Sequence, residues 1–216
     1  MRLIYVLLVT GILAVGMLWL GKLQLIRKRT AVISACAFIV CGGGLLLMAV
    51  LPGNSFYGET ITSVQVPNGK KLAALTFDDG PYHPYTQKLL VVLEEKQVKA
   101  TFFMMGNNAV KNPEVVTLVT SKGHEVALHA EEHRDFLKLN EQELVGNVLR
   151  GKKLLEELTG EPVKYLRPPH GFRDWAVMEA ASDAGLKVVN WSVIPRDWTN
   201  PGVQEIADRV CKNVTP

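Results

Sequence analysis

Two long apolar runs near the N-terminus most constrain how this chain can fold. Leu3 to Leu20 and Ala31 to Leu51 contain no charged residue, and each is close to the length of about 20 residues that spans a bilayer as a helix. The segment between them carries basic side chains and no acidic one. Because short basic loops stay on the cytoplasmic side, residues 1–52 are expected to form two transmembrane helices joined by a cytoplasmic loop.

A cleaved signal peptide is the alternative interpretation of the first apolar run. Only Arg2 precedes that run, and no small-residue cleavage site followed by a mature domain is present, so the hairpin is favoured. Both ends of the hairpin would then face outward, which predicts a multi-pass protein of the plasma membrane. The remainder of the chain is expected on the extracellular side.

Charge and cysteine content limit what the outer part of the chain can be. Residues 1–52 hold five basic and no acidic residues, which leaves 19 basic and 21 acidic residues beyond them. A slightly acidic domain is not expected to bind nucleic acid. Two of the three cysteines lie in the second apolar run, and Cys211 stands alone near the C-terminus. The outer domain therefore has no disulfide framework available, and a hydrophobic core must stabilise it. Nothing in the sequence indicates the oligomeric state.

Beyond a short linker, strand and helix patterns alternate. Residues 53–70 mix Gly, Ser and Pro with short β-prone stretches, and they are expected to form a stalk. In residues 71–216, apolar runs alternate with amphipathic stretches, as in parallel strands joined by helical crossovers. The expected strands cover residues 71–77, 100–105, 124–128, 164–166 and 187–193. Between and after them, helices are expected from residue 86 and from Asn112, Asn140, Asp174 and Asn200.

This alternation predicts an α/β fold. A distorted (β/α) barrel that lacks its final turn fits better than an open doubly wound sheet, although the pattern leaves both alternatives open. Both architectures gather functional residues at the carboxyl ends of their strands. The polar residues that follow the expected strands are Asp78, Asp79, His129, His133, Arg167, Asp197 and Trp198.

The adjacent acids Asp78 and Asp79 follow the first expected strand in the segment TFDDGP. Successive side chains of a strand point to opposite faces, so at least one of the two acids meets the buried side of the fold. An unpaired buried charge is too costly to keep. The candidates for its partner are a cation, a metal, or a shifted pKa that serves chemistry.

The segment HAEEH places His129 and His133 four residues apart, a spacing that on a helical turn lets both bind one metal ion. Alone, such a pair would be read as two surface histidines. Together with Asp79, however, it supplies the three nitrogen and oxygen ligands of a catalytic zinc site that keeps one position open for water. Asp78 would then be free to act as a general base. His124, at the opposite end of the same expected strand, is interpreted as structural.

These segments resemble the motifs of the polysaccharide deacetylases, the family 4 carbohydrate esterases with a NodB homology domain. The resemblance runs from about Lys71 to the end of the chain through TFDDGP, HAEEH, LRPPHG and RDW. It implies a distorted α/β barrel and a divalent metal, zinc or cobalt or another divalent ion. The roles that it implies are a general base for Asp78, metal ligands for Asp79, His129 and His133, an arginine that holds the base for Arg167, an oxyanion donor for the backbone N–H near His170, a histidine-orienting acid for Asp197, and substrate contacts for Pro169, His170 and Trp198.

The sequence also departs from the family pattern. Ala130 replaces a usual Ser or Thr, Ile194 replaces an acid, and His170 replaces a common aromatic residue. The family's final strand carries a Leu-His pair whose histidine protonates the leaving amine, and this chain reaches Pro216 without it. The resemblance therefore implies a C-terminally incomplete catalytic domain in which Asp197 lacks its partner.

The expected function is metal-dependent removal of N-acetyl groups from N-acetylhexosamine residues of a cell-envelope polysaccharide, such as peptidoglycan or a chitin-like polymer. The alternative is a membrane-tethered glycan-binding module with a deacetylase fold and little or no activity. A third possibility is a domain whose unpaired strand edges need a partner chain for stability.

Overall fold

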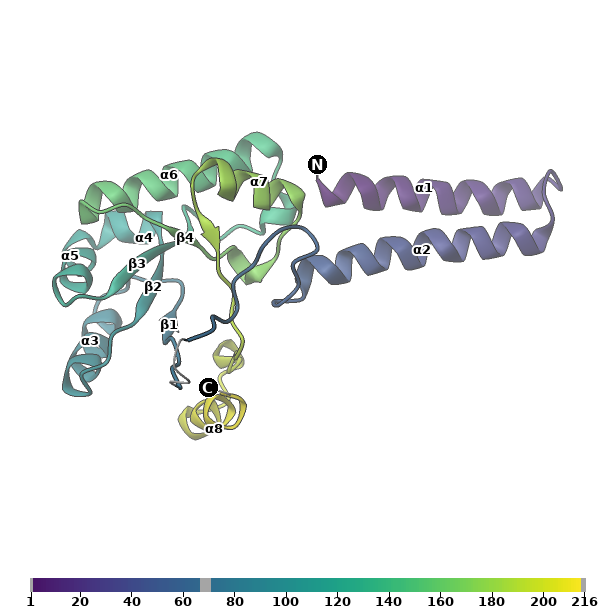
Figure 1. The fold of residues 1–216 in the computed structure, drawn as a ribbon. Helices are drawn as coiled ribbons and strands as arrows, with labels where there is room; N and C mark the ends of the chain where they lie inside the picture. Colours follow the sequence, from purple (N-terminus) through teal and green to yellow (C-terminus); the bar gives the residue numbers. More distant parts are fainter. Residues whose placement is uncertain (1, 67–70, 215–216) are drawn as a thin grey trace.

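The computed structural model describes residues 2–66 and 71–214, which form a helical hairpin followed by an α/β domain (Figure 1). The elements of these residues are α1 (Leu3–Lys22), α2 (Lys28–Val50), β1 (Thr76–Phe77), α3 (Tyr85–Glu95), β2 (Thr101–Met105), α4 (Gly106–Lys111), α5 (Pro113–Ser121), β3 (Glu125–Ala130), the 3-10 turn η2 (Phe136–Lys138), α6 (Glu141–Thr159), β4 (Tyr165–Leu166), η3 (Pro169–Gly171), α7 (Trp175–Asp183), β5 (Lys187–Val188), η4 (Asp197–Thr199) and α8 (Val203–Asn213).

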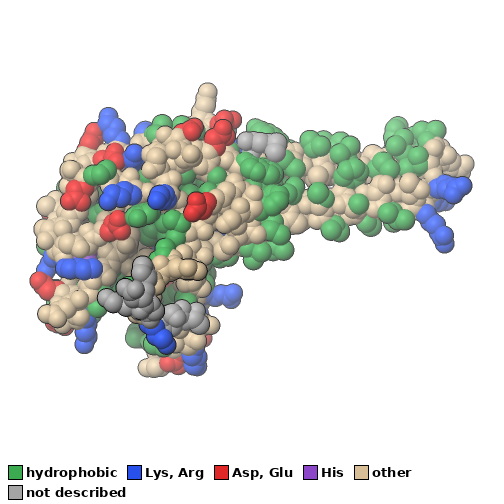
Figure 2. Space-filling view, in the orientation of Figure 1, with side chains coloured by type: hydrophobic (Ala, Val, Ile, Leu, Met, Phe, Trp, Pro, Cys, Tyr) green, Lys and Arg blue, Asp and Glu red, His purple; other side chains and the backbone are tan. Residues whose placement is uncertain are grey.

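The hairpin helices α1 and α2 lie side by side and project away from the rest of the molecule (Figure 1). Both are long and apolar enough to cross a membrane, a test that the core helix of a soluble protein or a signal sequence can also pass. Most of their residues are not buried, and hydrophobic side chains cover much of the projecting arm in Figure 2. An apolar surface of this extent suits a lipid environment better than water.

The five strands form one parallel sheet in the order β1-β2-β3-β4-β5. The helices that cover the sheet follow the same sequential order, since α3 contacts α5, α5 contacts α6, and α6 contacts α7. A doubly wound sheet reverses its strand order at a switch point, whereas a (β/α) barrel does not. The sequential order is therefore that of a barrel, and among the described residues β1 and β5 are not paired with each other.

The stalk contributes to the sheet as well. Ile61 forms an isolated parallel bridge with Val189, directly after β5. The backbone N–H of Ile61 donates to the carbonyl of Val188 at 2.9 Å, and the N–H of Asn190 donates to Ile61 at 2.9 Å. Part of the expected linker thus extends the β5 side of the sheet.

Local signals predict some helix starts correctly and fail at others. Asn140 and Glu143 form a capping box at the start of α6, and Asp174 accepts from the N–H of Val177 at the start of α7. Asn112 occupies the N-cap position of α5 and Pro113 its first turn, as predicted, although the Asn112 side chain donates to the carbonyl of Asn108 and makes no cap hydrogen bond. The prediction was wrong for Asn200, because α8 begins later, at Val203.

The expected strands are longer than the observed ones, and α4 was not predicted. β1 is confined to Thr76–Phe77, where residues 71–77 were expected, and β5 is confined to Lys187–Val188. Residues 71–75 are exposed, so the apolar run before β1 extends beyond the partly buried strand.

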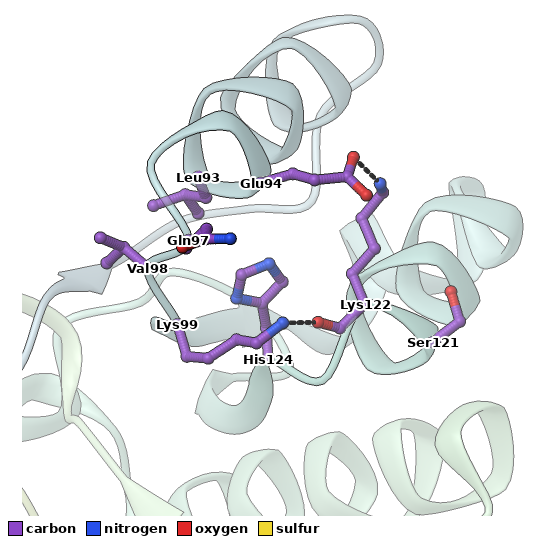
Figure 3. Close-up of a pocket in the computed structure, with 8 residues that line it drawn as sticks. All are labelled: Leu93, Glu94, Gln97, Val98, Lys99, Ser121, Lys122 and His124. Carbon is purple, nitrogen blue, oxygen red and sulfur yellow. Dashed lines mark hydrogen bonds and ion pairs between the residues drawn. The ribbon is translucent and has the colours of Figure 1, made fainter.

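His124 lies just before β3, at the end of that strand opposite to His129. Its Nδ1 accepts from the N–H of Ala100 at 3.2 Å, as expected for a structural histidine. It borders a pocket with Lys99 and Lys122 (Figure 3). Burial, and then the charges of these two lysines, lower the pKa of His124.

Candidate active site

Five of the predicted site residues meet at the carboxyl ends of neighbouring strands. Asp78 and Asp79 follow β1, His129 lies near the end of β3, His133 lies in the loop after it, and Arg167 follows β4. Because all the strands are parallel, their carboxyl ends share one edge of the sheet. The strand directions alone therefore bring these side chains together.

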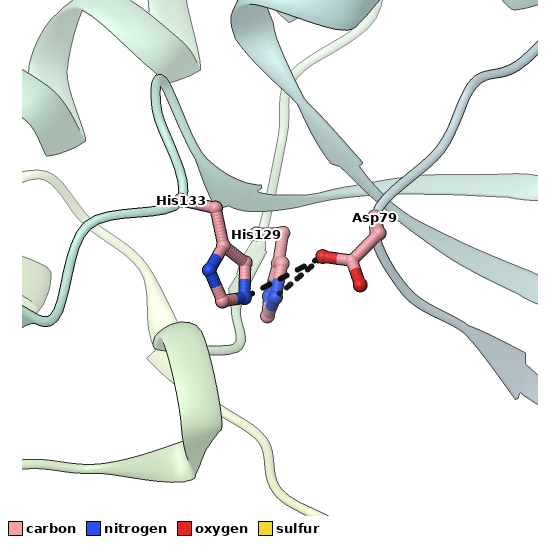
Figure 4. A group of neighbouring side chains, drawn as sticks. All are labelled: Asp79, His129 and His133. Atoms are coloured by element: carbon pink, nitrogen blue, oxygen red, sulfur yellow. Dashed lines mark ion pairs between the residues drawn. The ribbon is translucent and has the colours of Figure 1, made fainter. Parts of the chain in front are cut away.

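Asp79, His129 and His133 form a compact cluster (Figure 4). The Oδ1 atom of Asp79 lies 3.3 Å from Nε2 of His129 and 3.6 Å from Nε2 of His133. One ligand atom from each residue lies within 4.8 Å of the other two. A cation between these atoms would meet one carboxylate oxygen and two imidazole nitrogens.

The protonation of the cluster suits a cation. The hydrogen bond with His129 is the main cause that lowers the pKa of Asp79, although partial burial opposes it. Burial is the main cause that lowers the pKa of His133, followed by the charge of His129. At neutral pH, Asp79 is therefore ionised and His133 keeps its lone pair, which are the forms that bind a metal ion.

The tautomer of His129 is set by its neighbour. Its Nδ1 lies 2.7 Å from the backbone carbonyl oxygen of Arg167. A carbonyl can only accept, so Nδ1 carries a proton and donates it, which directs Nε2 toward Asp79 and His133. A hydrogen bond of this kind commonly orients histidine ligands of metal sites.

Asp78 pairs with Arg167 beside this cluster. The buried guanidinium donates to Oδ1 of Asp78 at 2.6 Å and to Oγ1 of Thr76 at 2.9 Å. It also lies over the ring of Phe103, 3.9 Å from the centroid. Burial lowers the pKa of Arg167 and the adjacent Asp78 opposes that shift, but an arginine remains charged in either case. Asp78 is thus held in one place with its second oxygen free of the guanidinium.

Two asparagines that the sequence interpretation missed support the cluster. The side chain of Asn108 donates to the carbonyl of Asp79 at 2.8 Å, and Asp79 has a left-handed backbone with φ of 69°. Asn147 of α6 accepts from the N–H of Glu131 and donates to the carbonyl of Glu132, so it fixes the turn between the two histidines. For Asn147 the available signal was a polar residue on the apolar face of a predicted helix, whereas Asn108 lies in α4, which was not predicted.

His170 borders the cluster from η3. Its ring centroid is 4.8 Å from that of His133 at an interplanar angle of 90°. His170 is exposed and has a left-handed backbone with φ of 60°, while Pro169 before it is buried. Of these two predicted substrate contacts, His170 lies beside the candidate metal centre.

Asp197 and Trp198 lie apart from the cluster. Both belong to η4, and the side chain of Trp198 is 63% exposed. Within the part of the chain that the structure describes, no hydrogen bond, ion pair or ring contact joins either residue to Asp79, His129 or His133. The geometry thus brings together most of the predicted site residues and leaves these two outside.

The donor set fits a divalent cation. One carboxylate and two imidazoles are ligands that zinc and other first-row divalent metals accept, with remaining positions open for water or substrate. A carboxylate held by an arginine stands next to them, and the cluster is partly exposed to solvent. By fold and cluster, the protein is a parallel α/β protein with a candidate metal centre of the hydrolase type.

The chain belongs to the polysaccharide deacetylase family. The family model matches residues 65–189, which is more than half of the chain. A peptidoglycan-N-acetylglucosamine deacetylase of Bacillus cereus is 41% identical over 151 residues, which cover 69% of this chain and 70% of that protein. The expected α/β fold of this family is therefore confirmed.

Two solved structures are similar in fold. A peptidoglycan N-acetylglucosamine deacetylase in complex with a hydroxamate-type benzamide has a TM-score of 0.68 and 33% identity, and the match covers 73% of this chain and 72% of that one. A family 4 carbohydrate esterase pseudoenzyme from Bacillus anthracis has a TM-score of 0.64 and 28% identity, with 68% and 53% covered. The family thus includes both deacetylases and a member described as a pseudoenzyme.

Proposed function

We propose that this protein is a metal-dependent deacetylase that hydrolyses N-acetyl groups on N-acetylhexosamine residues of a cell-envelope polysaccharide and releases acetate. The observation that carries the proposal is the position of the Asp78–Arg167 pair directly beside the Asp79–His129–His133 cluster. A base held next to a cation site is an arrangement that can catalyse hydrolysis of an unactivated amide. Peptidoglycan and chitin-like polymers are the substrate class that we propose.

Asp79, His129 and His133 would hold the cation, with zinc as the first candidate and cobalt or another divalent ion as alternatives. When bound, the cation supplies Lewis acidity toward the acetyl carbonyl and toward water. Asp78 accepts a proton from the attacking water, and the water oxygen bonds to the carbonyl carbon. Cleavage of the C–N bond then gives acetate and an amine, and Asp78 returns the proton to that amine.

The remaining residues would bind and orient. Arg167 holds Asp78 in place, and a backbone N–H near His170 stabilises the developing oxyanion. Pro169 and His170 line the substrate side of the cluster. Trp198 is proposed to contact the acetyl group, and Asp197 is proposed as the acid that orients a histidine, although this chain reaches Pro216 without the histidine that Asp197 would orient.

The proposal places the protein in the plasma membrane, with α1 and α2 as two spans and the α/β domain on the extracellular side. The basic residues of the intervening loop, Lys22, Arg27 and Lys28 among them, support a cytoplasmic loop. An enzyme that acts on envelope glycan needs its site on the outer side.

The test is acetate release from N-acetylglucosamine oligomers by the full chain in detergent or nanodiscs. We expect release with added zinc, loss of release with a chelator, and a fall of roughly 10²- to 10⁴-fold for Asp78→Asn, the range that a positioned general base contributes. The matched control is Asp183→Asn at the end of α7, far from the cluster in sequence and outside the proposed machinery. Release that is unchanged in Asp78→Asn would remove Asp78 from the role of base.

A second candidate function is a membrane-tethered glycan-binding module. The similarity to a pseudoenzyme of the same family favours it. Zinc binding and glycan binding by the folded chain, without acetate release from any tested N-acetylated oligomer, would support this candidate against the enzyme.

A further inference from the structure

Asp174 caps two helices that are far apart in the sequence. Its Oδ1 atom accepts from the N–H of Val177 at 3.0 Å at the start of α7, and its Oδ2 atom accepts from the N–H of Leu3 at 2.9 Å at the start of α1. Asp174 is fully buried, and the guanidinium of Arg2 pairs with it at 3.5 Å. One carboxylate of the α/β domain therefore stabilises the first turn of the hairpin.

The preceding residue, Arg173, binds the other end of the hairpin. Its backbone N–H donates to the carbonyl of Ala49, in the last turn of α2, at 3.1 Å. Its buried guanidinium donates to the carbonyls of Leu51 at 2.7 Å and Pro52 at 3.1 Å, and also to that of Asn54. A cation at a helix C-terminus matches the negative end of the helix dipole. Adjacent residues of opposite charge thus match the opposite ends of α1 and α2.

Apolar packing surrounds these polar contacts. Leu3, Ala49 and Tyr57 are buried together, and Trp175 and Met178 of α7 pack against them. Tyr57 and Trp175 meet edge to face with ring centroids 4.6 Å apart. The hairpin base is therefore packed against the α/β domain through both apolar and charged side chains.

The same residues connect to the candidate active site. Arg173 donates to the carbonyl of Gly171 at 3.0 Å, and Asn190 donates to that carbonyl at 3.2 Å and to Pro52 at 3.3 Å. Gly171 closes η3 directly after His170, whose ring contacts His133. The segment that holds the hairpin is thus continuous with the segment that borders the cluster.

We propose that Arg173 and Asp174 form a joint that locks the hairpin and the α/β domain into one rigid body, so that the site acts on glycan attached to the membrane surface. The substrate in this inference rests on the proposed function. The fixed orientation rests on the contacts of Arg173 and Asp174. A flexible stalk would let the site sample many orientations. A joint whose buried charged groups are hydrogen-bonded resists opening, because separation would leave Arg2, Arg173 and Asp174 without these partners. Arg173 is a positioning residue in this scheme and touches no reacting atom.

The first test measures the joint without any activity. Spin labels at Val15 of α1 and Lys153 of α6, both exposed, would report the distance between the hairpin and the domain in nanodiscs, in a chain whose three cysteines are replaced by serine. We expect one narrow distance distribution for the parent chain and a broad one for Arg173→Met, which keeps an unbranched apolar side chain and removes the donors. Arg209→Met on α8 is the matched control and should stay narrow.

The second test compares two substrates presented to the same nanodisc-embedded protein, a lipid-linked N-acetylglucosamine oligomer in the bilayer and the same oligomer free in solution. The preference is the ratio of turnover of the attached oligomer to turnover of the free one. We expect this ratio to be about tenfold lower in Arg173→Met than in the parent chain, because the orientation of the domain on the membrane is no longer fixed. Arg173→Lys should recover part of the preference, and any change common to both substrates cancels in the ratio.

The outcomes separate the two proposals. A broad distribution in the parent chain, or equal substrate preference in the parent and Arg173→Met, would overturn the joint. If Arg173→Met does not fold, Asp174→Asn takes its place, because it keeps an oxygen acceptor for only one of the two helix starts and loses the charge. Absence of acetate release from both substrates would count against the proposed function, while the label distances would still decide whether the joint is rigid.

Discussion

Arg167 donates from its guanidinium to Oδ1 of Asp78 at 2.6 Å, while its own backbone carbonyl accepts Nδ1–H of His129 at 2.7 Å. One residue at the end of β4 therefore positions the proposed base with its side chain and a proposed metal ligand with its main chain. A substitution of the Arg167 side chain can therefore test the role of Asp78 separately from the role of His129. Substitution alters the hold on Asp78 and leaves the carbonyl that orients His129 in place.

Arg167→Met is expected to lower kcat by about 10- to 10²-fold, because the base loses the contact that positions it. Arg167→Lys keeps the charge but cannot donate to Asp78, Thr76 and the carbonyl of Val189 at once, so it should recover only part of the rate. Zinc affinity, measured by calorimetry, should change little in both variants. A large loss of zinc affinity in Arg167→Lys would show that the guanidinium supports the metal centre as well as the base.

Removal of one metal ligand is expected to abolish tight zinc binding. His133→Gln should weaken the affinity by about 100-fold or more, a loss at least as large as that for changes in residues that only support a ligand. His83→Gln, an exposed histidine outside the cluster, is the matched control and should bind zinc as the parent chain does. Equal affinities of the two variants, measured by competition with a chromophoric chelator, would exclude the Asp-His-His cluster as the zinc site.

Strand direction explains how much of the site the sequence could predict. Asp78, Asp79, His129 and Arg167 each follow or end an apolar run, and parallel strands bring such positions to one edge whatever the details of packing. The helix start at Asn140 was predictable for a different reason, since both partners of its capping box lie within one turn of the sequence. The catalytic and ligand roles of these residues stay predictions.

Contacts between distant segments could not be predicted. Asn112 precedes a proline as a helix-starting asparagine often does, yet its side chain bonds to Asn108 and to the carbonyl of Pro81. Asp174 was predicted to cap α7, but nothing local indicates that its second oxygen caps α1. Tertiary packing decides which of several available acceptors a side chain meets, and residue patterns do not contain that information.

Two glycines of α6 are expected to respond oppositely to substitution by alanine, because one of them lies where the helix closely approaches β3. A Cβ at Gly151 would lie 2.8 Å from the backbone nitrogen of Glu131, next to the turn that carries the histidines. Gly151→Ala should lower the free energy of unfolding by about 1–3 kcal/mol, because backbone must move. A Cβ at Gly146 meets the flexible end of the Arg150 side chain. Gly146→Ala should therefore raise the free energy of unfolding by about 1 kcal/mol, because alanine has a higher helix propensity than glycine. Denaturant unfolding of the full chain measures the change in free energy of unfolding for each variant. Two changes of the same sign would contradict this account.

His124 should make stability fall as the pH falls through its folded pKa. Burial and the neighbouring lysines lower the pKa of His124 in the folded protein, whereas an unfolded histidine has a pKa of about 6.5. The unfolded state therefore binds the proton more readily, so the contribution of neutral His124 is fully present above about pH 6.5 and is lost below it. His124→Asn keeps an acceptor for the N–H of Ala100 and has no proton to take up. Its melting temperature should depend less on pH between about 7.5 and 5 than that of the parent chain, with His83→Asn as the control. Parallel curves for the parent and His124→Asn would show that His124 does not contribute to the acid sensitivity of the fold.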